Sequence, residues 1–112
     1  MCHIFAGQPP ANYAFQTRSM RLGGHSTSIR LEAAFWKILE EIAAAQEVSL
    51  AKFLTTLHDE VLDLHGEARN FASLLRCACL SYAMEIRSNP QATLKMQQQA
   101  REAFGLTMQA AE

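Results

Sequence analysis

Serine and arginine side chains that can form hydrogen bonds stand at every second position of one short run. They are Ser26, Ser28 and Arg30, and they alternate with Thr27, Ile29 and Leu31. Because side chains alternate between the two faces of a β-strand, the two sets lie on opposite faces. One face is therefore suited to a core and the other to a binding partner.

Other reactive residue types do not form a catalytic or metal-binding pattern. The sequence contains no Ser-His-Asp order, nucleophile elbow, phosphate loop or metalloprotease motif. His58 and His65 share a helix face near acidic residues, but two ligands two turns apart do not close a coordination shell. Cys77 and Cys79 lie two apart in a helical stretch, where they do not face each other, so we expect buried thiols. The prediction is a protein with no enzymatic activity, no metal and no cofactor.

Length and charge favour one small domain with a positive end. The 112 residues fit a single compact domain, and no apolar run approaches the roughly 20 residues of a membrane span. The first residues lack the features of a secretory signal, which favours the cytoplasm. The net charge is −1, but residues 1–31 hold three arginines and no acid, whereas residues 32–112 carry a charge of −4. The positive charge coincides with the polar strand.

The first third of the chain is expected to form an arm and a hairpin. Residues 1–16 contain Pro9-Pro10 and show no clear periodicity, which indicates an N-terminal arm. The two runs that flank Gly23-Gly24 predict a β-hairpin. A single strand cannot stand alone, because its backbone donors and acceptors have no partner, so a second copy of the chain is one way to complete the ribbon.

Amphipathic helices follow the hairpin. The first covers residues 32–46, and its apolar stripe consists of Phe35, Leu39, Ile42 and Ala43, widened by Trp36 and Ile38. The second is capped by Ser49 and ends before Gly66, with a stripe of Leu50, Phe53, Leu54, Leu57, Val61 and Leu64. The third is capped by Asn70 and is apolar around much of its circumference, so we expect it to be buried in a dimer or between dimers. A weaker helix begins at Asn89-Pro90 and needs a surface to lie on.

Residues 26–57 resemble the ribbon-helix-helix DNA-binding family, to which the repressors MetJ and Arc belong. Thr27 to Leu31 are similar to the family's strand, the stripe from Phe35 to Ala43 to its first helix, and Val48-Ser49 to the turn that opens its second helix. The longer stretch from Arg18-Ser19 to Asn70-Phe71 and Arg76 resembles an uncharacterised bacterial subgroup with an added third helix. The sequence departs from the family at Glu47, where Gly is usual. Glu47 must accept a strained backbone or use a different turn.

The resemblance implies a mostly α fold with a short N-terminal β-ribbon, assembled as an intertwined homodimer with extra C-terminal helices. It also implies a sequence-specific transcriptional regulator that reads the major groove of double-stranded DNA with its paired ribbon, using Ser26, Ser28 and Arg30 at base edges. Contacts with the phosphates of the DNA backbone are expected at the start of the second helix and along the basic strand. The residues are Ser49, Leu50, Lys52, Arg18, Arg21 and His25. Three parts follow: an arm (1–16), a ribbon-helix-helix domain with the third helix (17–87), and a C-terminal helix or tail (88–112).

Two alternatives stay open at this stage. The chain can be a protein-interaction module such as an antitoxin, whose segment 88–112 wraps a protein partner. It can also be an oligomeric scaffold that does not bind DNA, which the acidic helices favour. A tetramer is expected if the third helix joins two dimers. Whether residues 88–112 pack on their own chain tests the antitoxin hypothesis, because a segment packed in this way is not free to wrap another protein.

Overall fold

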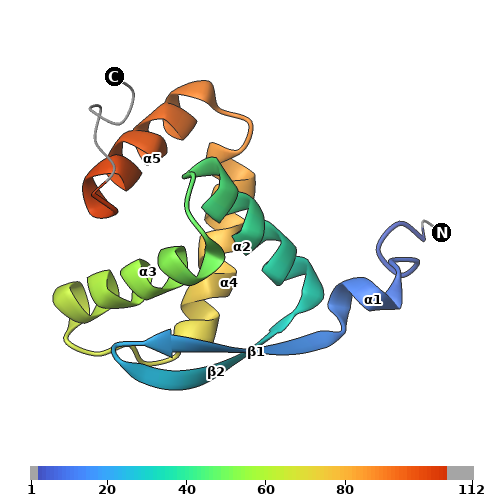
Figure 1. The fold of residues 1–112 in the computed structure, drawn as a ribbon. Helices are drawn as coiled ribbons and strands as arrows, with labels where there is room; N and C mark the ends of the chain where they lie inside the picture. The colour runs from blue at the N-terminus through green and yellow to red at the C-terminus, as the bar shows by residue number, and fades with distance from the viewer. Residues whose placement is uncertain (1–2, 106–112) are drawn as a thin grey trace.

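The computed structural model describes residues 3–105 as a β-hairpin covered on one face by helices (Figure 1). The elements in order are α1 (Pro10–Tyr13), β1 (Phe15–Leu22), β2 (His25–Glu32), α2 (Ala33–Ala45), α3 (Leu50–His65), α4 (Phe71–Ser81), the π-helix η1 (Tyr82–Ile86) and α5 (Pro90–Ala103). The predicted fold class, mostly α with a short N-terminal ribbon and extra C-terminal helices, is confirmed.

The ribbon forms within one chain. β1 pairs antiparallel with β2, from Leu22 opposite His25 at the turn to Phe15 opposite Glu32 at the far end. The two-residue loop has φ of 58° at Gly23 and 82° at Gly24, and two positive values in succession define a type I′ turn. Glycine adopts these values without a steric penalty, and the turn matches the twist of the strands. β2 therefore already has one partner strand within its own chain, without a second copy.

The inner face of the hairpin packs on α2 and α3 to form the core. Ile29 and Leu31 of β2 are buried against Trp36 and Leu39 of α2 and Leu54 of α3. Each large apolar side chain that becomes fully buried contributes about 1.5 to 3 kcal/mol. The predicted stripes of α2 and α3 are thus the core-facing sides of these helices, with one exception: Leu64, in the last turn of α3, is 78% exposed.

The turn between α2 and α3 uses a left-handed residue that is not glycine. Glu47 has a φ of +61°, and the N–H of Val48 then reaches back to the carbonyl oxygen of Ala43 at 3.1 Å. The Ser49 side chain accepts a hydrogen bond from the N–H of Lys52, as predicted for an N-cap. Of the two possibilities for Glu47, the chain has taken the strained backbone.

The third predicted helix, α4, differs from prediction at its start and in the exposure of one cysteine. Asn70 adopts a left-handed conformation with no side-chain cap, so its predicted capping role is wrong, whereas Asn89 does cap α5 by accepting from Ala92 N–H. Cys79 is buried, and burial raises the pKa of its thiol to about 11. Cys77 is exposed on the opposite side of α4, so the prediction of a buried thiol is wrong for Cys77 in the single chain.

The weak C-terminal helix has the surface that it needs. α5 packs back on its own chain through buried Ala100, and the Gln97 side chain donates to the carbonyl oxygen of Ala45 at 3.1 Å. The Thr93 hydroxyl donates to the carbonyl oxygen of Ile86 at 3.0 Å. These contacts fix α5 over the end of α2 and the π-helix.

Candidate nucleic-acid interface

The outer face of the hairpin collects polar and basic side chains from both strands. Cross-strand partners lie on the same face of a sheet, so the pairs Thr17–Arg30, Ser19–Ser28 and Arg21–Ser26 share it. All six side chains are exposed. The end of this outer face is formed by Phe15 opposite Glu32. The structure thus brings the predicted residues Ser26, Ser28, Arg30 and Arg21 together on one exposed surface.

Arg30 lies against an aromatic ring at the end of the outer face. Its guanidinium carbon is 4.1 Å from the ring centroid of Phe15, which is 52% exposed. Within residues 3–105, Arg30 forms no ion pair with an acid. Its hydrogen-bond donors therefore remain available to a ligand.

Arg21 stands at the other end of the outer face, beside the turn. One of its terminal nitrogens donates to the carbonyl oxygen of Gly24 at 3.0 Å. An arginine has five N–H donors, so this single bond leaves most of them free. The contact holds the charge of Arg21 next to the hairpin tip.

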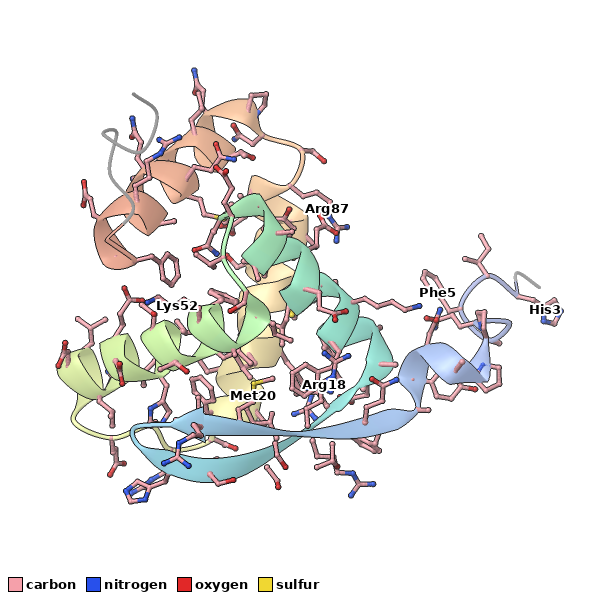
Figure 2. The ribbon with its side chains drawn as sticks, in the orientation of Figure 1. His3, Phe5, Arg18, Met20, Lys52 and Arg87 are labelled. Carbon is pink, nitrogen blue, oxygen red and sulfur yellow. The ribbon has the colours of Figure 1, made fainter. Side chains whose placement is uncertain are left out.

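Arg18 points to the opposite face, toward the helices. Figure 2 shows it together with Met20 between the hairpin and the helical layer. Its guanidinium pairs with Glu40 at 3.2 Å and lies 4.6 Å from the ring centroid of Trp36. The structure therefore does not bring Arg18 together with the other predicted contacts, and its partners are intramolecular.

Glu32, the acidic residue at the end of the outer face, pairs with an arginine of the helical layer. Glu32 forms an ion pair with Arg76 of α4 at 3.0 Å. A hydrogen bond from its own backbone N–H, together with the Arg76 contact, lowers the pKa of Glu32. The carboxylate is thus ionised and paired, which leaves the outer face with the positive charges of Arg21 and Arg30.

The remaining predicted phosphate contacts lie apart from the outer face. His25 is exposed at the turn, but its register places it on the same face as Leu22, which belongs to the core. Ser49 and Lys52 are exposed at the start of α3, and Leu50 is half-buried. In Figure 2 Lys52 lies on α3, on the helical side of the hairpin. One chain alone does not join these residues to Ser26, Ser28 and Arg30.

The two edges of the hairpin differ in what covers them. At β1 the Thr55 hydroxyl of α3 donates to the carbonyl oxygen of Arg21 at 3.1 Å, so α3 satisfies part of that edge. β2 has no second strand beside it in the described part of the chain, where the sheet has two strands only. An unpaired strand edge is a template for pairing with another strand.

Sequence reasoning missed three members of the outer face. Phe15, Thr17 and Ser19 were not predicted to lie there, whereas Arg18 was grouped with the contacts. The signal was present, because a two-residue Gly23-Gly24 loop fixes the register, and alternation along β1 then separates Thr17 and Ser19 from Arg18.

No metal or membrane feature competes with this surface within residues 3–105. The described residues contain no group of three or more metal-ligating side chains. The His58 ring packs edge-on against Phe71, 5.2 Å between centroids, and lies under the turn at Gly23. No helix in the same range is long and apolar enough to cross a membrane.

Comparisons with known proteins give a family and a solved structure. The family model for the ribbon-helix-helix domain matches residues 15–83. An uncharacterised protein from Bordetella pertussis Tohama I has a similar structure, with a TM-score of 0.72 and 40% sequence identity over 84% of this chain and 86% of that one. No curated protein matches the sequence.

Proposed function

The chain belongs to the ribbon-helix-helix family, and from this membership we propose that it is a sequence-specific DNA-binding protein that regulates transcription as a homodimer. The observation that carries the proposal is the outer face of the hairpin. Apart from Phe15 at its end, its exposed side chains are those of serine, threonine and arginine, which form hydrogen bonds with base edges and phosphates.

The free edge of β2 supports a dimer through strand pairing. Two copies of β2 that pair antiparallel satisfy each other's unpaired backbone groups and give a four-stranded sheet in the order β1-β2-β2-β1. Such an interface uses the same edge on both subunits, as two-fold symmetry requires. The outer faces of the two hairpins then form one continuous surface.

The width of the major groove assigns different roles to the two strands. The groove is about 12 Å wide and admits a two-stranded ribbon, whereas the outermost strands of a four-stranded sheet lie roughly 14 Å apart. The central β2 strands therefore enter the groove, and the β1 strands lie against its walls. Ser26, Ser28 and Arg30 contact base edges in this arrangement, while Arg21 contacts phosphates.

The flanks of the dimer supply the other proposed phosphate contacts. Ser49, Leu50 and Lys52 stand where free N–H groups and the positive end of a helix dipole suit an anion. His25 is exposed beside the turn, and we include it as a further phosphate contact. Arg18 is left out of this set, because Glu40 and Trp36 occupy its guanidinium.

The antitoxin alternative loses most of its candidate segment. Residues 90–103 form α5, which packs on its own chain through Ala100, Gln97 and Thr93. A helix held in this way is not free to wrap a protein partner. The end of the predicted segment, residues 106–112, lies outside the described residues. A scaffold that does not bind DNA remains the alternative, and binding measurements separate it from the proposal.

The experiment is the binding of purified protein to its own promoter fragment and to an unrelated fragment of equal length, at several salt concentrations. We expect tighter binding to the promoter than to the unrelated fragment. The logarithm of the binding constant should fall linearly with the logarithm of the salt concentration, because phosphate contacts release counterions. Lack of binding to both fragments at low salt would contradict the proposal and favour the scaffold. A regulator whose operator lies elsewhere would bind both fragments equally, and selection from random duplexes then locates its site.

A further inference from the structure

Phe15 is an apolar residue in a place where burial does not explain it. It occupies the end of the outer face, among serine, threonine and arginine side chains, and half of it is exposed to water. Its cross-strand partner is Glu32, whose carboxylate turns away to Arg76. The contact that the Phe15 ring does make is with the guanidinium of Arg30, at 4.1 Å.

The register explains why these two side chains meet. Arg30 is directly opposite Thr17, so Phe15 is its diagonal neighbour on the same face. Diagonal neighbours are within reach of aromatic and long side chains. The donors of a guanidinium lie in its plane, so a ring stacked on the guanidinium leaves them free to bind acceptors.

Arg30 differs from the other arginines that contact an aromatic ring. The other three each also pair with a carboxylate: Arg18 with Trp36 and Glu40, Arg76 with Phe35 and Glu32, and Arg87 with Tyr82 and Glu41. These ion pairs join β1 to α2, α4 to the end of β2, and the residue after η1 to α2. Among residues 3–105, Arg30 is the arginine that has an aromatic support without an acid. Its guanidinium therefore lies against a ring, while no acid among these residues neutralises its charge.

We propose that Phe15 is a positioning residue that sets the specificity of DNA reading by holding the Arg30 guanidinium toward the bases. This inference rests on the proposed function, since it assumes that Arg30 binds a base edge. Restricting Arg30 to one orientation reduces the entropy lost when it pairs bidentately with the O6 and N7 of guanine. Phe15 thus strengthens discrimination of guanine without adding a charge.

The test compares Phe15→Leu, which keeps an apolar side chain but lacks the ring, with Phe15→Tyr, which keeps the ring. Tyr13→Leu is the matched control, because Tyr13 is a similarly exposed aromatic residue at the end of α1, outside the hairpin. Each protein is titrated against the DNA site that the wild type selects from random duplexes. It is also titrated against the same site with one guanine replaced by 7-deazaguanine, which lacks the N7 acceptor. Thermal unfolding and the molecular mass in solution check that every variant stays folded and keeps its oligomeric state.

We expect Phe15→Leu to weaken binding to the guanine site by about twofold to fivefold for each subunit, the range of an exposed cation–π contact. The loss should be smaller on the 7-deazaguanine site, and the salt slope should be unchanged because no charge is lost. Phe15→Tyr and Tyr13→Leu should bind like the wild type. In an Arg30→Ala background, Phe15→Leu should have no further effect.

Two results would overturn the inference while leaving the proposed function intact. One is specific binding by Phe15→Leu that equals the wild type. The other is an equal loss with and without Arg30, which would mean that Phe15 acts independently of that arginine. If the wild type binds no DNA specifically, both the proposed function and this inference are refuted.

Discussion

Arg18 and Arg30 lie twelve residues apart on paired strands, and the structure predicts opposite consequences for their loss. Arg30 is on the exposed outer face with an aromatic neighbour and no acid among residues 3–105, whereas Arg18 is on the inner face with Glu40 and Trp36. Replacing Arg30 with Ala should therefore weaken DNA binding and lower the free energy of unfolding only slightly. Replacing Arg18 with Ala should weaken folding and leave the DNA contacts intact.

The magnitudes follow from the contacts of each side chain. A bidentate contact between arginine and guanine is worth about 1 to 3 kcal/mol of discrimination, so Arg30→Ala should cost roughly 5-fold to 150-fold in affinity for each half-site. Its folded-state contact is an exposed cation–π pair, worth about 0.5 to 1 kcal/mol. Arg18→Ala loses a cation–π pair over buried Trp36, a half-exposed ion pair worth about 0 to 1 kcal/mol, and the packing of its stem. We expect it to lower the free energy of unfolding by about 1 to 2 kcal/mol.

The assay measures both quantities on the same proteins. Urea unfolding gives the free energy of unfolding, and titration of a labelled duplex at several salt concentrations gives affinity and salt slope. Lys95→Ala is the charge-matched control, because Lys95 is exposed on α5, far along the chain from the ribbon. A smaller salt slope at unchanged stability for Arg18→Ala would contradict its placement on the inner face. Unchanged affinity of Arg30→Ala for the selected site would contradict its role in DNA binding.

Three further predictions concern single residues. Glu47→Gly should raise the free energy of unfolding by about 0.5 to 1 kcal/mol in urea titrations, because glycine relieves the left-handed strain at some cost in chain entropy. Cys77, which is exposed, should react with a maleimide in the native protein, whereas buried Cys79, with a thiol pKa of about 11, should react only after unfolding, as mass spectrometry would show. A hydrogen bond from Arg87 lowers the pKa of Glu41 below its ordinary 4.5. The ionised Glu41 therefore stabilises the fold above pH 4.5, and this stabilisation is lost as the pH falls further. The free energy of unfolding of Glu41→Gln should depend less on pH in acid.

The hairpin and the helices could be predicted because local residues determine them. Gly23-Gly24 selects a two-residue turn, alternation from Ser26 to Leu31 separates the two faces, and Ser49 caps α3 as expected. Charge alone grouped Arg18 with the other proposed contacts, but charge does not say which face of a strand an arginine occupies. Alternation along β1, counted from the turn, would have placed it correctly.

Other differences depend on contacts between distant segments, which periodicity does not contain. Asn70 is a common capping residue, yet the path from α3 into α4 puts it in a left-handed conformation where its side chain does not cap. Leu64 continues the apolar stripe of α3, but no other segment of the described chain buries it. The interaction of Phe15 with Arg30 needs the register of two strands, and the sequence shows it only after that register is fixed.

The distribution of ion pairs explains how a chain with a net charge of −1 can present a positive ribbon. Glu32, Glu40 and Glu41 are each paired with an arginine that links the helical layer together or to the hairpin, so their charges are neutralised within the protein. Arg21 and Arg30 have no such acidic partner among the described residues, and they lie on the face that the helices leave open. Exposed charges farther away than about 8 Å are largely screened at physiological ionic strength, so DNA at the outer face responds mainly to these nearby arginines. The net charge of the chain therefore does not argue against DNA binding, because the surface that would meet DNA is locally positive.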